Sequence, residues 1–172
     1  MQLLRVRNVK LFFTYFNPKN VPPPIALRYL SVSQFNPILP KIKHMYATRE
    51  KGNLWWSVGH GNLTNHKRVI RSWCARRLRH AFRQALKQRG FDKDGKLLMF
   101  DVEGNVTEKK KGLVGTLDIR MNVELLTAKY ADIVQQAGLL VDHLRYQQLR
   151  PAKKRTKQPS AKGSRTPKVE AT

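Results

Sequence analysis

The sequence has few acidic residues, a single cysteine and no long apolar run. Its 172 residues include 34 lysines and arginines against 11 aspartates and glutamates, a formal net charge of +23. A folded protein this basic ordinarily neutralises a polyanion, because self-repulsion otherwise opposes the compact state. No apolar stretch approaches the roughly 20 residues that cross a bilayer, so membrane insertion is not expected. The lone cysteine, Cys74, excludes an intramolecular disulfide and a cysteine-based zinc site.

Catalytic signatures are also missing from the sequence. It contains no phosphate-binding Gly-Lys loop, dinucleotide fingerprint, zinc-protease helix or kinase signature. The five histidines show no ligand spacing with a carboxylate or cysteine. Asp101 with Glu103, or Asp118, would be the candidates for a nuclease metal pair, but balancing nearby lysines is the simpler role. We therefore expect no enzyme, no cofactor, no metal and no small-molecule substrate.

The positive charge is unevenly distributed along the chain. Residues 1–91 hold 18 basic residues and one acidic residue, Glu50, whereas residues 92–149 hold eight basic and nine acidic residues. Residues 150–172 again hold eight basic residues and one acidic residue. The middle part resembles an ordinary protein scaffold, and the two flanks resemble polyanion-binding arms.

Residues 64–91, TNHKRVIRSWCARRLRHAFRQALKQRGF, are predicted to form one long helix. Thr64 or Asn65 would cap its start, and Gly90 would end it. Apolar side chains recur in it at three- and four-residue spacing, which is the period of one buried helical face. These residues are Ile70, Trp73, Cys74, Leu78, Ala81, Phe82 and Ala85.

The opposite side of this helix carries a row of cations. Successive residues turn by about 100°, which places five of them in one sector: Arg68, Arg76, Arg79, Arg83 and Lys87. The row is about 28 Å long at about 1.5 Å per residue, and the helix has no acidic residue to pair with it. Because a row of one sign repels itself and arginine matches phosphate oxygens, we interpret it as an RNA-binding face rather than a solvated one. Arg77 inside the apolar arc and Arg71 at its edge either extend past the core or line a phosphate-filled groove.

Other residues are candidate RNA contacts outside this helix. Trp55 and Trp56 would stack on unpaired bases, although packing beneath the domain is the preferred alternative. Two basic clusters complete the set: Lys109, Lys110 and Lys111, and Lys153, Lys154 and Arg155.

Residues 1–51 are expected to be a basic, proline-rich, extended segment. Six prolines lie between residues 17 and 48, which argues against a long helix or a central strand. Residues 1–20 are basic and free of acids, as in a mitochondrial transit peptide. The alternative is that residues 9–16 form a buried strand, and an uncleaved mitochondrial signal would satisfy both interpretations.

Residues 52–149 are predicted to form a small two-layer α/β (α+β) domain. Strand patterns at 97–102 and 116–123 would make a two-stranded antiparallel β element, followed by a second helix at 126–149. The order helix, strand, strand, helix lets both helices cover the strands. Residues 150–172 are expected to be a disordered basic tail.

The chain is similar in composition to mitochondrial ribosomal proteins, with an acid-free basic N-terminal segment, a small scaffold and a lysine-rich tail. We expect an RNA-binding structural component of a ribonucleoprotein in the mitochondrial matrix, contacting rRNA and neighbouring ribosomal proteins. One alternative is a nuclear or nucleolar nucleic-acid-binding protein, with KKRTK at 153–157 as its address. Others are an RNA-processing or tRNA-acting enzyme, an assembly factor and a peripheral membrane protein. The sequence leaves the RNA and the ribosomal subunit open.

Overall fold

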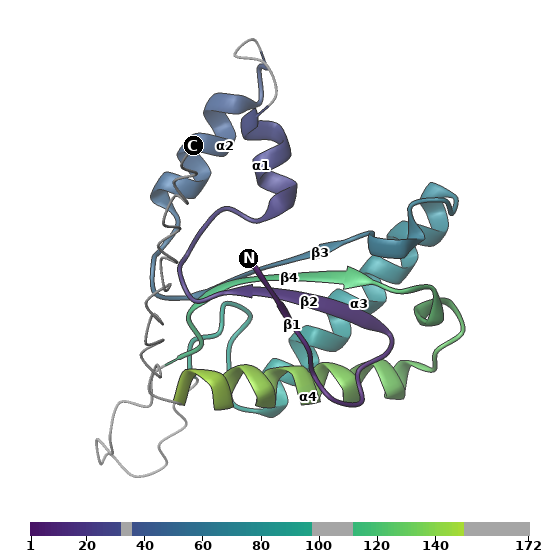
Figure 1. Cartoon of the computed structure of the whole chain (residues 1–172). Helices are drawn as coiled ribbons and strands as arrows, with labels where there is room; N and C mark the ends of the chain where they lie inside the picture. Colours follow the sequence, from purple (N-terminus) through teal and green to yellow (C-terminus); the bar gives the residue numbers. More distant parts are fainter. Residues whose placement is uncertain (32–35, 98–111, 150–172) are drawn as a thin grey trace, which may run out of the picture.

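The structure, a computed structural model, describes residues 1–31, 36–97 and 112–149 (Figure 1). These residues form a mixed α+β domain, as the sequence predicts. In chain order the elements are β1 (Gln2–Leu4), β2 (Phe12–Asn17), α1 (Pro24–Ser31), α2 (Leu39–Thr48), β3 (Leu54–Gly59), η1 (Gly61–Leu63), α3 (Arg68–Gln88), β4 (Gly115–Met121), η2 (Val123–Leu126) and α4 (Tyr130–Leu149).

The described strands form one four-stranded sheet in the order β1-β2-β4-β3. β2 pairs antiparallel with β1 and with β4, whereas β3 and β4 are parallel. A parallel pair needs a crossover connection, and the segment that contains α3 supplies it. β3 is last in the strand order and is therefore an edge strand. The 3-10 turn η1 separates it from α3 along the chain.

The N-terminal residues belong to this sheet, so the expectation of an extended segment outside the domain is wrong for residues 2–17. Phe12 and Phe16 on β2 are 2% and 9% exposed and lie in the main core. The alternative prediction of a buried strand at 9–16 is confirmed by the pairing of β2 with β4. Of the expected two-stranded antiparallel element, the strand predicted at 116–123 belongs to a four-stranded mixed sheet, in which β2 and β3 pair with it from distant parts of the sequence.

The proline-rich region between the first strands and β3 also has regular structure. It forms α1 and α2, which pack on each other and project from the side of the sheet opposite α4 (Figure 1). Pro24 begins α1 and Pro40 lies in the first turn of α2. Proline suits these positions, since its φ angle is already helical and its missing N–H has no partner in a first turn. The expectation of a segment without regular structure is therefore wrong here, although both helices are short, with eight residues in α1 and ten in α2.

The long basic helix is confirmed as α3, but it begins later than predicted. Lys67 precedes its first turn with no side-chain cap, and Thr64 lies in the turn after η1. Its end is as predicted: Gly90 has φ of 76°, and the N–H of Phe91 donates to the carbonyl of Leu86 at 3.0 Å. This left-handed stop lets Phe91 fold back into the core beside α3.

α3 and α4 pack against the same face of the sheet and against each other. β4 confirms the strand predicted at 116–123, and α4 confirms the second helix, which starts after η2. Leu97 forms an isolated antiparallel bridge with Phe91, and the rest of the strand predicted at 97–102 lies outside the described residues. No described helix has the length and apolar character needed to cross a bilayer.

A candidate nucleic-acid interface

The row of cations on α3 faces outward, as the helical pattern predicts. Arg68, Arg76, Arg79, Arg83 and Lys87 are all exposed. Among the described residues, none of the five forms an ion pair. The ion pairs in this part of the chain are Arg89–Asp142, Lys96–Glu50 and Arg120–Asp118. The positive charge of the row is therefore uncompensated by nearby carboxylates.

Glu50, the single acidic residue of residues 1–91, is engaged away from this row. Its carboxylate accepts from Lys96 Nζ at 2.6 Å and from Asn53 Nδ2 at 2.9 Å. The hydrogen bonds from Lys96 and Asn53 hold the pKa of Glu50 below its usual value. Glu50 thus neutralises Lys96 and contributes little to the charge balance of α3.

Arg77 and Arg71 differ from the five exposed cations. Arg77 donates to the carbonyl of Ala128 at 2.8 Å, and its guanidinium lies 4.4 Å from the ring centre of Trp73. It therefore holds the segment before α4 against α3. Arg71 is half-buried, and its Nε has no hydrogen-bond partner within the described ranges.

The positive field extends beyond the N-terminal end of α3. His60, in the turn between β3 and α3, has a lowered pKa. Partial burial is the main cause, and the charges of Arg71 and Arg79 lower the pKa further. The field of α3 therefore acts on the loop that follows β3.

The two tryptophans of β3 point to opposite faces of the sheet. Trp55 is 2% exposed, its ring centre lies 5.6 Å from that of Tyr46, and its Nε1 donates to the carbonyl of Glu50 at 3.1 Å. A ring buried in this way is not available to an unpaired base, so the stacking role predicted for Trp55 is wrong. The preferred alternative of packing is what the structure shows for this residue.

Trp56 is half-buried on the α3 side of the sheet. Its ring packs edge-on against Phe82 with the ring centres 4.9 Å apart, and its Nε1 donates to the carbonyl of Lys93 at 2.8 Å. The guanidinium of Arg83 lies over the same ring, 5.8 Å from its centre. Trp56 therefore connects the core to the cationic surface of α3.

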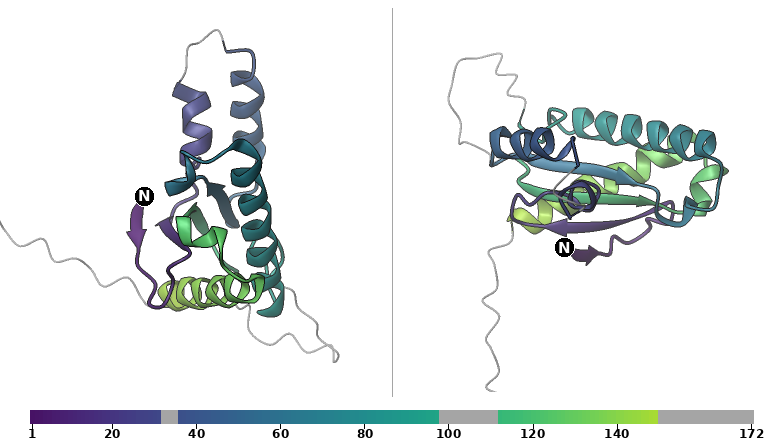
Figure 2. Two further views of the ribbon diagram at one scale, coloured as in Figure 1. Left: turned by 90° about the vertical axis from the view of Figure 1, so that its right-hand side faces the viewer. Right: turned by 90° about the horizontal axis from the view of Figure 1, so that it is seen from above.

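A groove adjoins this surface where α3, the edge of β3 and the α1–α2 hairpin meet. It has a volume of about 340 Å³. Trp56, Ser57 and Val58 of β3 line it, together with Ile25 of α1 and Asp94. Four cations line it: Arg79 and Arg83 from α3, Arg49 from the end of α2 and Lys93 from the turn after α3. Seen from above, the hairpin stands over the part of the sheet nearest to β3 and α3 (Figure 2).

Sequence reasoning missed Arg49 and Lys93 as members of this surface. Arg49 follows a segment that we expected to be irregular, and Lys93 lies in what reads as an ordinary polar turn. Neither has a periodic relation to the cations of α3. Only the folding of the α1–α2 hairpin against β3 brings Arg49 to the groove, where its guanidinium lies 5.1 Å from the ring centre of Trp55.

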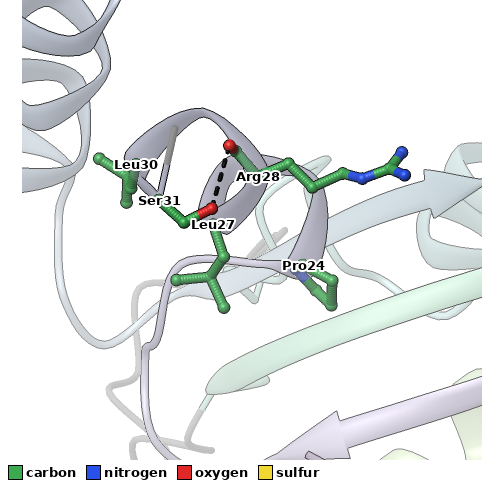
Figure 3. A pocket seen from close by; sticks show the side chains of 5 residues that line it. All are labelled: Pro24, Leu27, Arg28, Leu30 and Ser31. Atoms are coloured by element: carbon green, nitrogen blue, oxygen red, sulfur yellow. Dashed lines mark hydrogen bonds between the residues drawn. The ribbon is translucent and has the colours of Figure 1, made fainter. Parts of the chain in front are cut away.

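A second hollow lies on the surface of α1 and has a volume of about 450 Å³. Figure 3 shows that the side chains of Leu27, Leu30 and Arg28 point in different directions around the helix, while Ser31 Oγ donates to the carbonyl of Arg28 at 3.2 Å. The polar groups do not converge on one point. This hollow therefore has the character of an apolar surface rather than of a chemical site.

Asp118, the described member of the carboxylates considered for a nuclease, is 2% exposed on β4. It accepts hydrogen bonds from Ser57 Oγ at 2.8 Å and from Arg120 Nε at 3.0 Å. Its charge is thus balanced inside the sheet. The described part of the chain contains no cluster of three or more metal-binding side chains.

Several predicted residues lie outside the described residues. They are Asp101, Glu103, Lys109, Lys110, Lys111, Lys153, Lys154 and Arg155. The tail expected at 150–172 lies there as well.

Comparison of the chain with protein-family models, with curated proteins and with solved structures gave no match.

Proposed function

We propose that this protein is an RNA-binding structural component of a ribonucleoprotein, with α3 as its main contact to RNA phosphates. The observation that carries the proposal is the exposed row of five cations on α3, which has no carboxylate partner among the described residues. A polyanion would relieve the mutual repulsion of these cations. It would also release its own condensed counterions, which favours binding at low salt.

The shape of this surface supports recognition of RNA backbone rather than of base sequence. A helix with cations along about 28 Å can present charge to successive phosphates without its side chains reading base edges in a groove. Double-stranded RNA is recognised mainly through its shape and its phosphates. The proposed mechanism is therefore phosphate neutralisation by a rigid helix that is fixed to the sheet by its buried face.

We propose further that the ribonucleoprotein is the mitochondrial ribosome, and that the protein resides in the matrix. The basic, acid-free segment 1–20 supports import. Because β1 and β2 lie in this segment, cleavage after it would remove two strands and expose the side of β4 that pairs with β2. We therefore expect the targeting segment to be retained in the mature protein.

Charge reversal on α3 tests RNA binding directly. Arg76, Arg79 and Arg83 changed together to Glu should weaken binding to structured RNA by about 100-fold or more at low salt, and should reduce the slope of log K against log salt by roughly 2–2.7, at 0.7–0.9 per lost contact. Fluorescence anisotropy across a salt series measures both quantities, and circular dichroism checks folding.

A matched control has the same net charge. Arg5, Arg7 and Lys10 are exposed near the opposite edge of the sheet, and their reversal to Glu should weaken binding much less. Equal losses in the two variants would show that only net charge matters, and the assignment of α3 as the contact surface would then fail.

Sedimentation tests the assembly and the compartment. Tagged protein from purified mitochondria should migrate with a ribosomal subunit on a sucrose gradient and should shift to the top after RNase treatment. Absence from mitochondria would contradict the mitochondrial proposal and favour a nuclear ribonucleoprotein. Mitochondrial protein at the top of both gradients would contradict a structural role.

Mass spectrometry of the mature protein tests the retained N-terminus. Peptides from residues 1–20 should be present in protein recovered from the matrix. Recovery of a chain that begins after residue 20 would mean that the sheet described here is not the mature sheet.

A further inference from the structure

The groove beside α3 differs from the rest of the basic surface because its cations converge. Arg79 and Arg83 come from one wall, whereas Arg49 comes from the end of α2 and Lys93 from the turn after α3. Asp94 is the one carboxylate among the lining residues. Four positive charges around a concave site attract an anionic chain more strongly than the same charges on a convex surface, since the cleft focuses the field.

The free edge of β3 adds backbone N–H donors to these cations. The N–H of Leu54 points away from β4 and donates to the carbonyl of Asp94 at 2.9 Å. Because backbone groups alternate along a strand, the N–H groups of Trp56 and Val58 point to the same free edge. Outside the strand ladders, no described backbone carbonyl accepts a hydrogen bond from either of them. Trp56 and Val58 also line the groove.

Two of the four groove cations, Arg49 and Arg83, lie over the tryptophan rings of β3. Arg49 lies 5.1 Å from the ring centre of Trp55, and Arg83 lies 5.8 Å from that of Trp56. The carbonyl of Lys93 accepts from Trp56 Nε1. Each tryptophan thus positions a cation from a different wall, which reduces the ordering cost of binding.

The base of the α1–α2 hairpin is also fixed to the sheet. Asn20 Nδ2 donates to the carbonyl of Asn53 at 2.7 Å, and Asn20 Oδ1 accepts from the N–H of Gly52 at 3.1 Å. Thr116 Oγ1 on β4 accepts from the N–H of Val21 at 2.8 Å. The wall that carries Arg49 is therefore attached to the domain on both sides of the hairpin.

We propose that this groove binds the backbone of a single-stranded RNA segment, while the convex part of the α3 row contacts an adjoining duplex. The inference rests on the proposed function. It assigns single-stranded RNA and duplex RNA to different parts of the basic surface. A depression of about 340 Å³ admits a phosphate with its sugar, whereas an A-form duplex is too wide to enter it. Positively charged grooves that follow the backbone are the usual means of binding single strands.

An acidic peptide strand added along β3 is the competing occupant. The free edge extends only from Trp56 to the end of β3, since the Leu54 N–H is already bonded to Asp94. So short an edge offers few ladder hydrogen bonds, whereas the cations lie on both walls. The observations therefore favour RNA over a peptide.

Two pairs of substitutions separate the groove from the convex row. Arg49→Gln with Lys93→Gln removes two groove cations but leaves all of α3 intact, and Arg76→Gln with Lys87→Gln removes two row cations outside the groove. The probes are a fluorescein-labelled oligouridylate and a labelled RNA duplex of mixed sequence at one salt concentration. We expect the groove pair to weaken oligouridylate binding by about tenfold and duplex binding by less than about twofold. The row pair should weaken duplex binding more than oligouridylate binding.

The outcomes distinguish failure of this inference from failure of the proposed function. Wild-type protein that binds neither RNA would overturn both. Wild-type protein that binds both RNAs, with the groove pair reducing the two affinities equally or not at all, would overturn the groove assignment alone. If the groove pair weakened binding of a labelled polyglutamate but left oligouridylate binding unchanged, the groove assignment to RNA would also be overturned. That result would indicate an acidic peptide as the occupant. Unchanged circular dichroism spectra are required for every variant compared.

Discussion

α3 and α4 are nearly equal in length and pack against the same face of one sheet, yet their outer surfaces differ in charge. α3 has 21 residues and no acidic residue, whereas α4 has 20 residues and carries Asp132 and Asp142 together with Arg145. Their inner faces are alike, with seven buried residues on α3 and six on α4. The fold therefore needs the inner faces of both helices but not the charge of α3. We propose that a polyanionic partner accounts for that charge.

Removing a large buried side chain from either inner face should lower the free energy of unfolding by a similar amount. Phe82 on α3 and Leu140 on α4 are fully buried. Phe82→Ala should lower the free energy of unfolding by about 3–5 kcal/mol and Leu140→Ala by about 2–5 kcal/mol, because each leaves a cavity in a closely packed core. Urea denaturation measures both changes. A cost below about 1 kcal/mol at Phe82 alone would show that α3 is packed loosely and that the two helices are not equivalent.

A smaller effect is expected at the ion pair that joins the two helices. Arg89, at the end of α3, contacts Asp142 of α4 through both guanidinium nitrogens Nε and Nη2, each at 2.6 Å. Asp142→Asn should cost about 1 kcal/mol, the upper end for a solvent-exposed pair, because the contact is bidentate but the Asp142 side chain is 55% exposed. Denaturation at neutral pH measures this difference. No change would mean that solvent screens the pair completely.

This contribution should also depend on pH. The hydrogen bonds from Arg89 lower the pKa of Asp142 below its usual value of 3.8. Since the folded-state pKa is the lower one, the stabilisation is present above the unfolded value and is lost as the pH falls through the folded value. The stabilities of wild type and Asp142→Asn should therefore begin to converge only as the pH falls below about 3.8, and should be equal once the pH is below the lowered folded-state pKa. A difference that persists at lower pH would contradict this assignment.

The difference between the two helices was visible in the sequence because it is local. The basic side of α3 follows from the spacing of side chains on one continuous helix, and so does its buried side from Cys74 onward. The same spacing was wrong for Ile70 and Trp73, which are exposed. The stop at Gly90 follows from the freedom of glycine to adopt positive φ. β4 was predicted for the same reason, from its alternation of apolar and polar residues. These features require no knowledge of distant parts of the chain.

The features that the sequence did not predict depend on pairing between distant segments. The apolar and aromatic residues of β2 suit both a central strand and a targeting segment, and its pairing with β4 shows that it is a strand. Prolines were treated as helix breakers, although Pro24 and Pro40 occupy first turns, where they are tolerated. Because the groove needs both the hairpin and β3, Arg49 was missed as a binding residue.

The outer face of α3 should be mildly destabilising when no partner is bound. Arg79 has Arg76 three residues before it and Arg83 four residues after it. Arg79→Gln should therefore raise the free energy of unfolding by about 0.4–1 kcal/mol at low salt, at 0.2–0.5 kcal/mol for each like-charged pair. The gain should disappear at high salt. The same substitution should raise the pKa of His60, because the charge of Arg79 contributes to lowering that pKa in the wild type.

Denaturation at two salt concentrations and an NMR titration of His60 measure these two effects. α4 offers the comparison, because its exposed outer positions contain no corresponding run of like charges. Equal stability of wild type and Arg79→Gln at low salt, with the pKa of His60 unchanged, would show that the row is not electrostatically strained. The charge of α3 would then need no partner to explain it.

The smallest net effect is expected at Gly138, where α4 passes beneath the Arg89 side chain. A Cβ at this position would lie 2.6 Å from Arg89 Nη2, so the guanidinium would have to move away from Asp142. Alanine also improves helix propensity by about 0.8–1 kcal/mol over glycine, which offsets the weakened ion pair. Gly138→Ala alone should therefore change stability by less than about 0.5 kcal/mol.

A double-mutant cycle reveals the two cancelling effects. In the Asp142→Asn background the ion pair is already lost, so Gly138→Ala should stabilise the protein by about 0.5–1 kcal/mol. The same gain in both backgrounds would show that Arg89 is not held over Gly138 by Asp142. The cycle thus tests whether the Arg89–Asp142 ion pair between α3 and α4 requires a glycine at position 138. The answer does not depend on the charge of the outer face of α3.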